Sequence, residues 1–148
     1  MKYLEHVITM WEKDCVIDKT SLDESSRQTP KLHAKYLPIH AEAKMMLRRA
    51  QMEQKTLLKQ KWLYYNGKMS QDEIEAKGWE FDPFKGLKVL KGEMDYYYDA
   101  DVDIQASEDK IQELKILVEM LQEIVDNIKW RHQTIGNMIK WRMFEAGS

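Results

Sequence analysis

Residues 44–62 carry basic and aromatic side chains at a spacing that places them on one face of a helix. At ~100° of rotation per residue, five of them fall within about 60° of one another: Lys44, Arg48, Lys55, Lys59 and Trp62. Three further side chains of the same types follow: Lys61, Tyr64 and Tyr65. Such a row offers cations to the phosphates of a single nucleic-acid strand and rings on which bases stack. A solvated basic helix face without a partner would show the same pattern.

The tripeptide Lys-Trp-Arg occurs twice, as Lys129-Trp130-Arg131 and Lys140-Trp141-Arg142. A separation of eleven residues is about three helical turns, so both copies lie on one side of a helix. Their four cations, Lys129, Arg131, Lys140 and Arg142, are further candidates for binding phosphate. An exposed tryptophan favours a partner that covers it. The two rings therefore pack between subunits or serve as stacking platforms.

The net charge of −2 over 148 residues conceals an uneven distribution. Residues 31–68 hold nine Lys/Arg against two Glu, whereas residues 69–128 hold six Lys/Arg against sixteen Asp/Glu. Two interpretations are open. The basic segment can offer a positive face to a partner while the acidic surface limits non-specific adhesion, or the two charged helix faces neutralise each other across an interface.

The sequence lacks the motifs that catalysis requires. There is no phosphate-binding Gly-rich loop, no nucleophile elbow and no HExxH or CxxC run. Asp99, Asp101 and Asp103 suggest a divalent-cation site, but an acidic approach to a helix N-terminus explains them better. The single Cys15 excludes an internal disulfide, and no apolar run reaches the ~18 residues of a membrane span. We expect no metal and no cofactor.

Helices must position these side chains, because 6 Gly and 3 Pro leave little material for turns. Apolar spacing predicts a helix over 2–13, a break over 14–21 and a long helix over 21–66. Pro30 and Pro38 predict a kink or a restart within it, and Gly67 predicts its end. Ser70 begins a capping box for a short helix that ends at Gly78.

The region 79–103 is irregular, with a short strand pair expected from Leu87, Val89 and the Tyr96–Tyr98 run. A last helix is expected over about 108–145. Its apolar residues follow steps of three and four, which is the heptad pattern of a coiled coil. This predicted oligomerisation seam comprises Ile111, Leu114, Val118, Leu121, Val125, Ile128, Ile135 and Ile139, with His132 at one position.

The predicted fold is therefore mainly α: a long kinked N-terminal helical arm and a long C-terminal heptad helix in an oligomeric helical assembly, joined by a short irregular or β-containing middle segment. The expected divisions are 1–68, a helical region with the basic DNA-binding helix, 69–106, an acidic connector, and 107–148, an oligomerisation helix. The heptad helix packs either on the 30–66 helix or on copies of itself, and both arrangements are compatible.

Several short segments resemble the UvsY family of phage recombination mediators. They are Val16-Ile17-Asp18, Lys35-Tyr36-Leu37, His40, Met46-Leu47-Arg48, Leu58-Lys59-Gln60-Lys61, Tyr64-Tyr65-Asn66-Gly67 and Arg142-Met143-Phe144-Glu145-Ala146-Gly147. The resemblance implies a non-enzymatic protein that binds single-stranded DNA as a ring-like homo-oligomer, hexameric or heptameric. It also implies that the protein helps load a RecA-like recombinase onto DNA covered by single-strand-binding protein, in the cytoplasm of the infected bacterial host.

The family's DNA-contacting basic pair, a Lys and an Arg, falls on Lys59 and Lys61 of this chain. Lysine at the second place keeps the charge but lacks the planar fork of arginine. Two other functions stay open. One is a coiled-coil adaptor or chaperone that binds an acidic protein through the same basic faces. The other is a metal-dependent nuclease that uses Asp99, Asp101 and Asp103.

Overall fold

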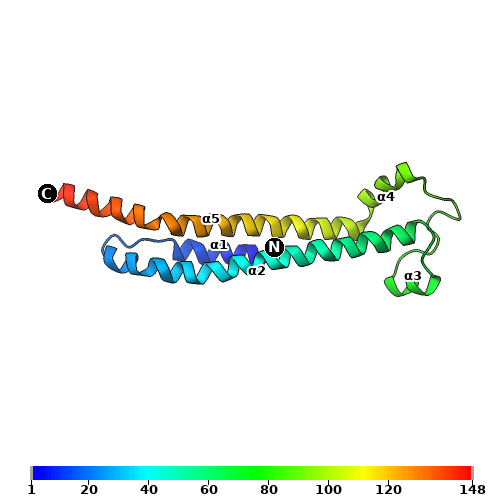
Figure 1. The fold of residues 1–148 in the computed structure, drawn as a ribbon, viewed down its shortest axis with the longest axis horizontal. Helices are drawn as coiled ribbons and strands as arrows, with labels where there is room; N and C mark the ends of the chain where they lie inside the picture. Colours follow the sequence, from blue (N-terminus) through cyan, green and yellow to red (C-terminus); the bar gives the residue numbers. More distant parts are fainter. Residues whose placement is uncertain (1, 148) are drawn as a thin grey trace. The chain divides into compact units, whose positions relative to one another are not determined.

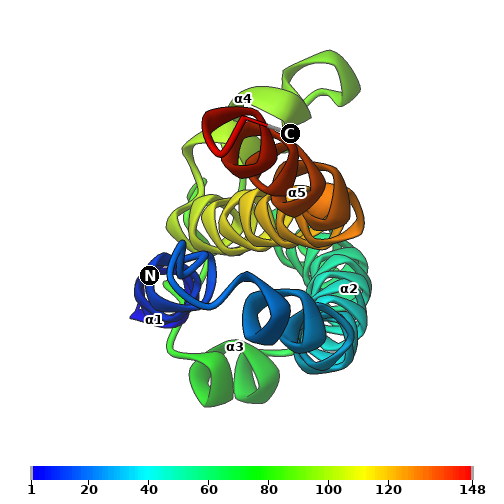
Figure 2. The ribbon, with the colours of Figure 1, turned by 90° about the vertical axis from the view of Figure 1, so that its left-hand side faces the viewer.

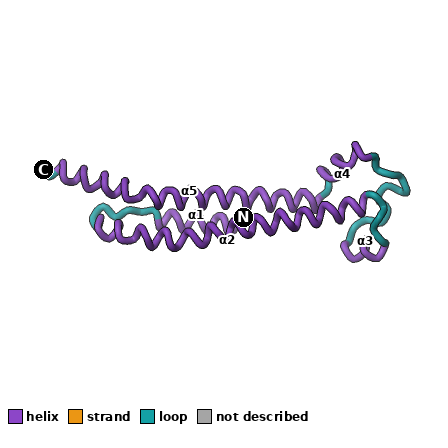
Figure 3. The backbone as a smooth tube through the Cα atoms, in the orientation of Figure 1, coloured by secondary structure: helices purple, strands orange, loops and turns teal. Residues whose placement is uncertain are grey.

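The computed structural model describes residues 2–147, which form helices and turns and include no β-strand (Figures 1 and 3). The elements are α1 (Lys2–Asp14), α2 (Leu22–Tyr65), α3 (Gln71–Lys77), the 3₁₀ turn η1 (Lys91–Glu93), α4 (Met94–Ala100) and α5 (Val102–Glu145). The mainly α prediction, with one long helix toward each end of the chain, is confirmed. Within these residues, no helix is both long enough and apolar enough to cross a membrane.

The chain forms two compact units. The first contains Met1–Met46 and Glu113–Ser148, and the second contains Leu47–Gln112. Both α2 and α5 contribute residues to each unit, so this grouping differs from the three consecutive segments that the sequence suggested.

In the first unit, α1 lies beside the N-terminal part of α2 and the C-terminal part of α5 (Figure 2). The rings of Trp11 and Tyr36 meet edge to face, with centroids 5.4 Å apart. The Tyr36 hydroxyl donates to Asp14, 2.8 Å away, which ties α2 to the end of α1. Val7 and Tyr36 are fully buried. These contacts hold α1 against α2.

The heptad seam of α5 lies mostly inside the chain. Six of its members are at most 3 % exposed: Ile111, Leu114, Leu121, Val125, Ile128 and Ile135. The prediction that these residues join subunits needs correction, because they already fill the core of the chain and present no surface to a second copy. Of the other two members, Val118 is half-buried and Ile139 is exposed. His132 is also exposed, and its Nδ1 lies 2.9 Å from the Lys129 carbonyl oxygen.

Helix α2 runs without interruption through Pro30 and Pro38, so the expected restart does not occur. Proline lacks the amide hydrogen that would bond the carbonyl four residues earlier, at Ser26 and Ala34. Both of those residues are exposed, so water can satisfy the two carbonyl groups.

The end of α2 and the start of α3 follow the predicted local rules. Gly67 adopts a left-handed φ of 69°, and the amide of Lys68 donates back to the Leu63 carbonyl. Ser70 Oγ accepts from the Glu73 amide, and Gly78, with φ of 72°, ends α3. The end of α2 is therefore fixed by backbone conformation.

The expected strand pair is wrong, because Tyr96–Tyr98 lie on the short helix α4. Helix α5 also begins earlier than expected, at Val102. Asp101 caps it, since Asp101 Oδ1 accepts from the amides of Asp103 and Ile104. The prediction that the acidic residues Asp99, Asp101 and Asp103 lie around a helix N-terminus is confirmed.

Candidate nucleic-acid interface

The end of α2, in the second unit, presents the cations that the sequence singled out. Arg48, Lys55 and Lys59 are exposed, and none of them makes an ion pair within residues 2–147. Trp62 is 42 % exposed, and Lys68 Nζ lies 4.5 Å from the centroid of its ring. Lys44, on the part of α2 that belongs to the first unit, is likewise exposed and outside every ion pair of the described chain. Unpaired cations are the ones that can take a phosphate without first giving up a partner.

Lys61 is placed differently from this row. It is 3 % exposed, and its ammonium lies 3.0 Å from Asp101 and 2.8 Å from Asp103. The same ammonium stands 3.7 Å from the centroid of the Trp79 ring, a cation–π contact. The expectation that Lys61 is a surface cation for DNA is therefore corrected: a helix turns 200° in two residues, so Lys61 faces inward where Lys59 faces solvent.

The Lys61 ion pair ties three segments of the second unit together. Trp79 Nε1 donates to Asp103 Oδ2 at 2.9 Å, and the Tyr65 hydroxyl donates to Asp101. Burial alone would raise the pKa of Asp101, but hydrogen bonds from Tyr65 and Lys61 outweigh it and hold that pKa below its usual value. Burial and the bond to Asp101 raise the pKa of Tyr65. These contacts hold Trp79 and the start of α5 against the end of α2.

Tyr64 and Tyr65 are not free stacking platforms in this structure. Tyr64 is 7 % exposed, donates to the Glu80 carbonyl and lies 5.1 Å, centroid to centroid, from Trp79. Tyr65 is half-buried and lies 5.7 Å from Phe84. Both rings form the aromatic core at the end of α2, and this departs from the expectation that they extend the basic row.

In both Lys-Trp-Arg copies the arginine is bound to another part of the chain, whereas the lysine and the tryptophan lie at the surface. Arg131 is 5 % exposed and donates to the carbonyls of Cys15 and Val16, each at 3.3 Å, while Arg142 donates to the Lys19 carbonyl. The arginines thus fasten the α1–α2 connection to α5, so Arg131 is corrected from a surface cation to a buried anchor. Burial lowers the pKa of Arg131, although it remains charged.

The lysines and tryptophans of the two copies remain at the surface. Trp130 is 59 % and Trp141 is 65 % exposed. Lys129 lies 3.9 Å from Asp126, a long exposed pair, and Lys140 makes no ion pair within the described chain. These four side chains fit either of the two roles that the sequence left open.

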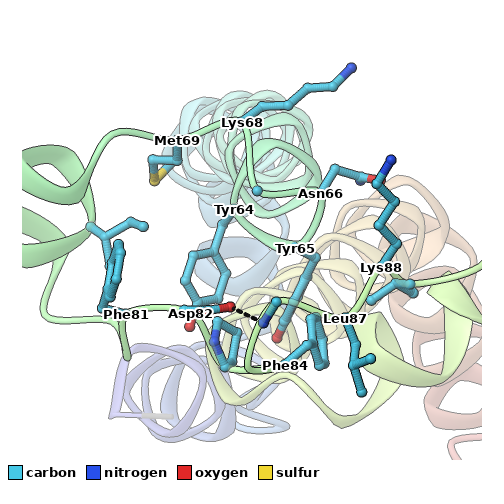
Figure 4. A pocket seen from close by; sticks show the side chains of 15 residues that line it. Tyr64, Tyr65, Asn66, Lys68, Met69, Phe81, Asp82, Phe84, Leu87 and Lys88 are labelled. Atoms are coloured by element: carbon cyan, nitrogen blue, oxygen red, sulfur yellow. Dashed lines mark hydrogen bonds between the residues drawn. The ribbon is translucent and has the colours of Figure 1, made fainter.

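A second group of cations lies outside the residues that the sequence singled out. Lys68, Lys85, Lys88 and Lys91 are all exposed and unpaired within residues 2–147. Two of them line a cavity of about 510 Å³ at the end of α2, together with Tyr64, Tyr65, Phe81 and Phe84 (Figure 4). The spacing of three between Lys85, Lys88 and Lys91 was a visible signal, but the acidic average of residues 69–128 concealed it.

Two of the three aspartates of the nuclease alternative have carboxylates that are engaged in other contacts. Asp101 and Asp103 both pair with Lys61, and the Asp99 carbonyl accepts from Gln105. Across residues 2–147, no three His, Cys, Asp or Glu side chains cluster in a way that could hold a metal ion. The Asp101 carboxylate caps α5 and pairs with Lys61, and the Asp103 carboxylate pairs with the same lysine.

Comparisons with known proteins agree with one another. The profile of the family "Recombination, repair and ssDNA binding protein UvsY" matches residues 10–148. The recombination protein UvsY of Enterobacteria phage T4 is 29 % identical over 144 residues, which cover 97 % of this chain and 98 % of that protein.

Two crystal structures of the bacteriophage T4 recombination mediator protein UvsY share the fold. One, in lattice type II, has a TM-score of 0.79 at 28 % identity and covers 96 % of both chains. Another, in lattice type IV, has a TM-score of 0.76 at 26 % identity and covers 96 % of this chain and 98 % of that one. With a profile that covers nearly all of the sequence, the chain belongs to the UvsY family of recombination, repair and single-stranded-DNA-binding proteins.

Proposed function

We propose that this protein binds single-stranded DNA as a ring-like homo-oligomer and promotes loading of a RecA-like phage recombinase onto DNA covered by single-strand-binding protein. It acts without catalysis, in the cytoplasm of the infected bacterial host. Membership of the recombination mediator family supports the general role. The binding mode rests on the surface chemistry of this chain.

The row of exposed, unpaired cations at the end of α2 carries the proposal. Arg48, Lys55 and Lys59 lie on one helix face that ends at Trp62 and Lys68. Phosphates of a flexible strand can follow such a row while a base stacks on the indole. Lys61 lies on the inner side of the same helix, where it pairs with Asp101 and Asp103, and it makes no contact with the strand.

The C-terminal end of α5 supports self-association. Ile139, Trp141, Met143 and Phe144 are 42–72 % exposed, and Trp141 and Phe144 meet edge to face with centroids 5.8 Å apart. Asn137, Lys140, Trp141 and Phe144 line a hollow of about 370 Å³. An apolar patch of this kind indicates a protein interface. The subunit contact is therefore proposed at this end of α5 instead of along the buried seam.

Assembly would turn weak contacts into strong binding. One row neutralises few phosphates, but several rows in a ring engage one strand together at high effective concentration. The wrapped strand would stay attached while single-strand-binding protein leaves and recombinase enters. Avidity of this kind requires no large interface between any one subunit and the strand.

The test compares Lys59→Ala with Lys110→Ala, which removes an exposed lysine already paired with Glu53 at 3.6 Å. The affinity of the wild-type protein for oligothymidylate should fall with salt by roughly 0.7 in log–log slope for each phosphate neutralised. Lys59→Ala should lower that slope, whereas Lys110→Ala should leave it unchanged. Equal slopes in all three proteins would refute the assignment. Tight binding of a soluble acidic protein, without DNA binding, would indicate the adaptor alternative.

A further inference from the structure

The cavity at the end of α2 has the lining of a site for a flat aromatic ligand. Its volume of about 510 Å³ lies within the range of small-molecule pockets. Figure 4 shows the rings of Phe81, Tyr64, Tyr65 and Phe84 gathered around it, with Met69 on the same side as Tyr64. Tyr64, Met69 and Ile74 are at most 9 % exposed, so they form a fixed floor.

The outer wall of the cavity is open to solvent. Phe81 is 56 % and Leu87 is 78 % exposed. Residues 82–86 form turns, in which the Asp82 carboxylate accepts from the Gly86 amide at 2.9 Å and the Asp82 carbonyl accepts from the Lys85 amide at 3.1 Å. A ligand could therefore enter without displacing the core.

The edge of the cavity is positively charged. Lys68 and Lys88 line it, and in Figure 4 their amino groups point away from the rings. Residues 81–91 contain three lysines and one aspartate, which makes them a basic stretch within the acidic part of the sequence. A ligand with a planar apolar body and negative charge beside it matches this arrangement.

Lys68 connects the cavity with the cation row. It lines the cavity and also holds its ammonium over the ring of Trp62, where the row ends. A strand that follows Lys55, Lys59 and Trp62 would thus arrive at the cavity without leaving basic surface.

We propose that this cavity takes one unstacked base of the single strand, with the flanking phosphates on Lys68 and Lys88. The inference rests on the proposed binding of single-stranded DNA and adds to it a base-binding site outside the α2 row. Phe81 supplies the accessible stacking face, and Lys88 supplies a phosphate contact. An apolar side chain of a protein partner is the competing occupant, but it would gain nothing from the lysines.

The test uses the full chain and two strands of equal length: a short oligothymidylate and an abasic phosphodiester strand. Phe81→Ala should weaken thymidylate binding by about fivefold to a hundredfold, the range for loss of one base–aromatic stack, and leave abasic binding unchanged. Lys88→Ala should weaken binding of both strands. Leu90→Ala is the matched control, since Leu90 is exposed in the same segment but does not line the cavity.

Phe81→Tyr keeps a ring and should restore thymidylate binding, which separates stacking from a folding defect. If Phe81→Ala behaves like Leu90→Ala while Lys59→Ala still weakens binding, the base-binding site is refuted and the proposed function stands. If the wild-type protein binds neither strand, both the site and the proposed function are wrong.

Discussion

Replacing Lys61 by alanine should destabilise the second unit without removing a DNA contact. The variant leaves Asp101, whose side chain is 4 % exposed, as a buried carboxylate without its cation. Breaking a buried ion pair from one side costs about 3–5 kcal/mol. Asp103 is 46 % exposed and can turn to water, so the lower end, about 3 kcal/mol, applies here.

The assay is thermal unfolding followed by circular dichroism. For a chain of this size a loss of 1 kcal/mol lowers Tm by about 2–4 °C, so Lys61→Ala should melt roughly 6–12 °C below the wild type. The matched control is Lys59→Ala, two residues earlier on the same helix but exposed, which should melt within about 1 °C of the wild type. The combination Lys61→Met with Asp101→Asn should recover part of the loss, because asparagine still caps α5 and no buried charge remains.

The pH dependence of this ion pair has a definite sign. The fold lowers the pKa of Asp101, so its contribution is complete above the unfolded value of about 3.9 and is lost as pH falls through the folded value. The Tm gap between wild type and Lys61→Ala should therefore narrow at low pH. A Lys61→Ala protein that melts like the wild type yet binds DNA as poorly as Lys59→Ala would refute the reasoning and return Lys61 to the DNA-contact surface.

Two further predictions concern the first unit. Arg131→Ala removes both hydrogen bonds to the Cys15 and Val16 carbonyls, so it should lower the free energy of unfolding by about 2–3 kcal/mol. Amide hydrogen exchange in the α1–α2 connection should become faster, while the affinity for oligothymidylate stays unchanged. An unchanged exchange rate would contradict the anchoring role of Arg131. Burial, aided by Lys44 and opposed by Asp126, lowers the pKa of His40, so stability should decline as pH falls below about 6.5. His40→Leu should abolish that part of the decline in urea titrations, and a decline that persists would exclude His40 as its source.

Local sequence rules predicted the helices and their ends well. Gly67, Ser70 and Gly78 act through their own backbone conformation and short-range hydrogen bonds, so a few neighbouring residues suffice to read them. The prolines show where such rules fail. Their cost in α2 is small because the affected carbonyls are exposed, and exposure is a tertiary property.

Side-chain environment was the less predictable part of the candidate site. Lys59 and Lys61 are two residues apart and chemically identical, yet one is exposed and the other is 3 % exposed. Lys61 is buried because it pairs with Asp101 and Asp103, about forty positions later in the sequence. The residues around Lys61 do not predict that pairing. Likewise, the heptad spacing of α5 correctly indicated an apolar stripe, but spacing does not reveal whether the stripe meets its own chain or a copy.

The central claim is that self-association lets several weak cation rows act on one strand. The most direct test measures mass by sedimentation and the salt slope of oligothymidylate binding on the same samples, for wild type and Phe144→Asp. The wild-type mass should be a multiple of 17.7 kDa, with a steep slope, while Phe144→Asp, changed at a residue 72 % exposed, should stay folded with a lower mass and a shallower slope. A wild-type protein of 17.7 kDa that still binds the strand tightly would contradict the account.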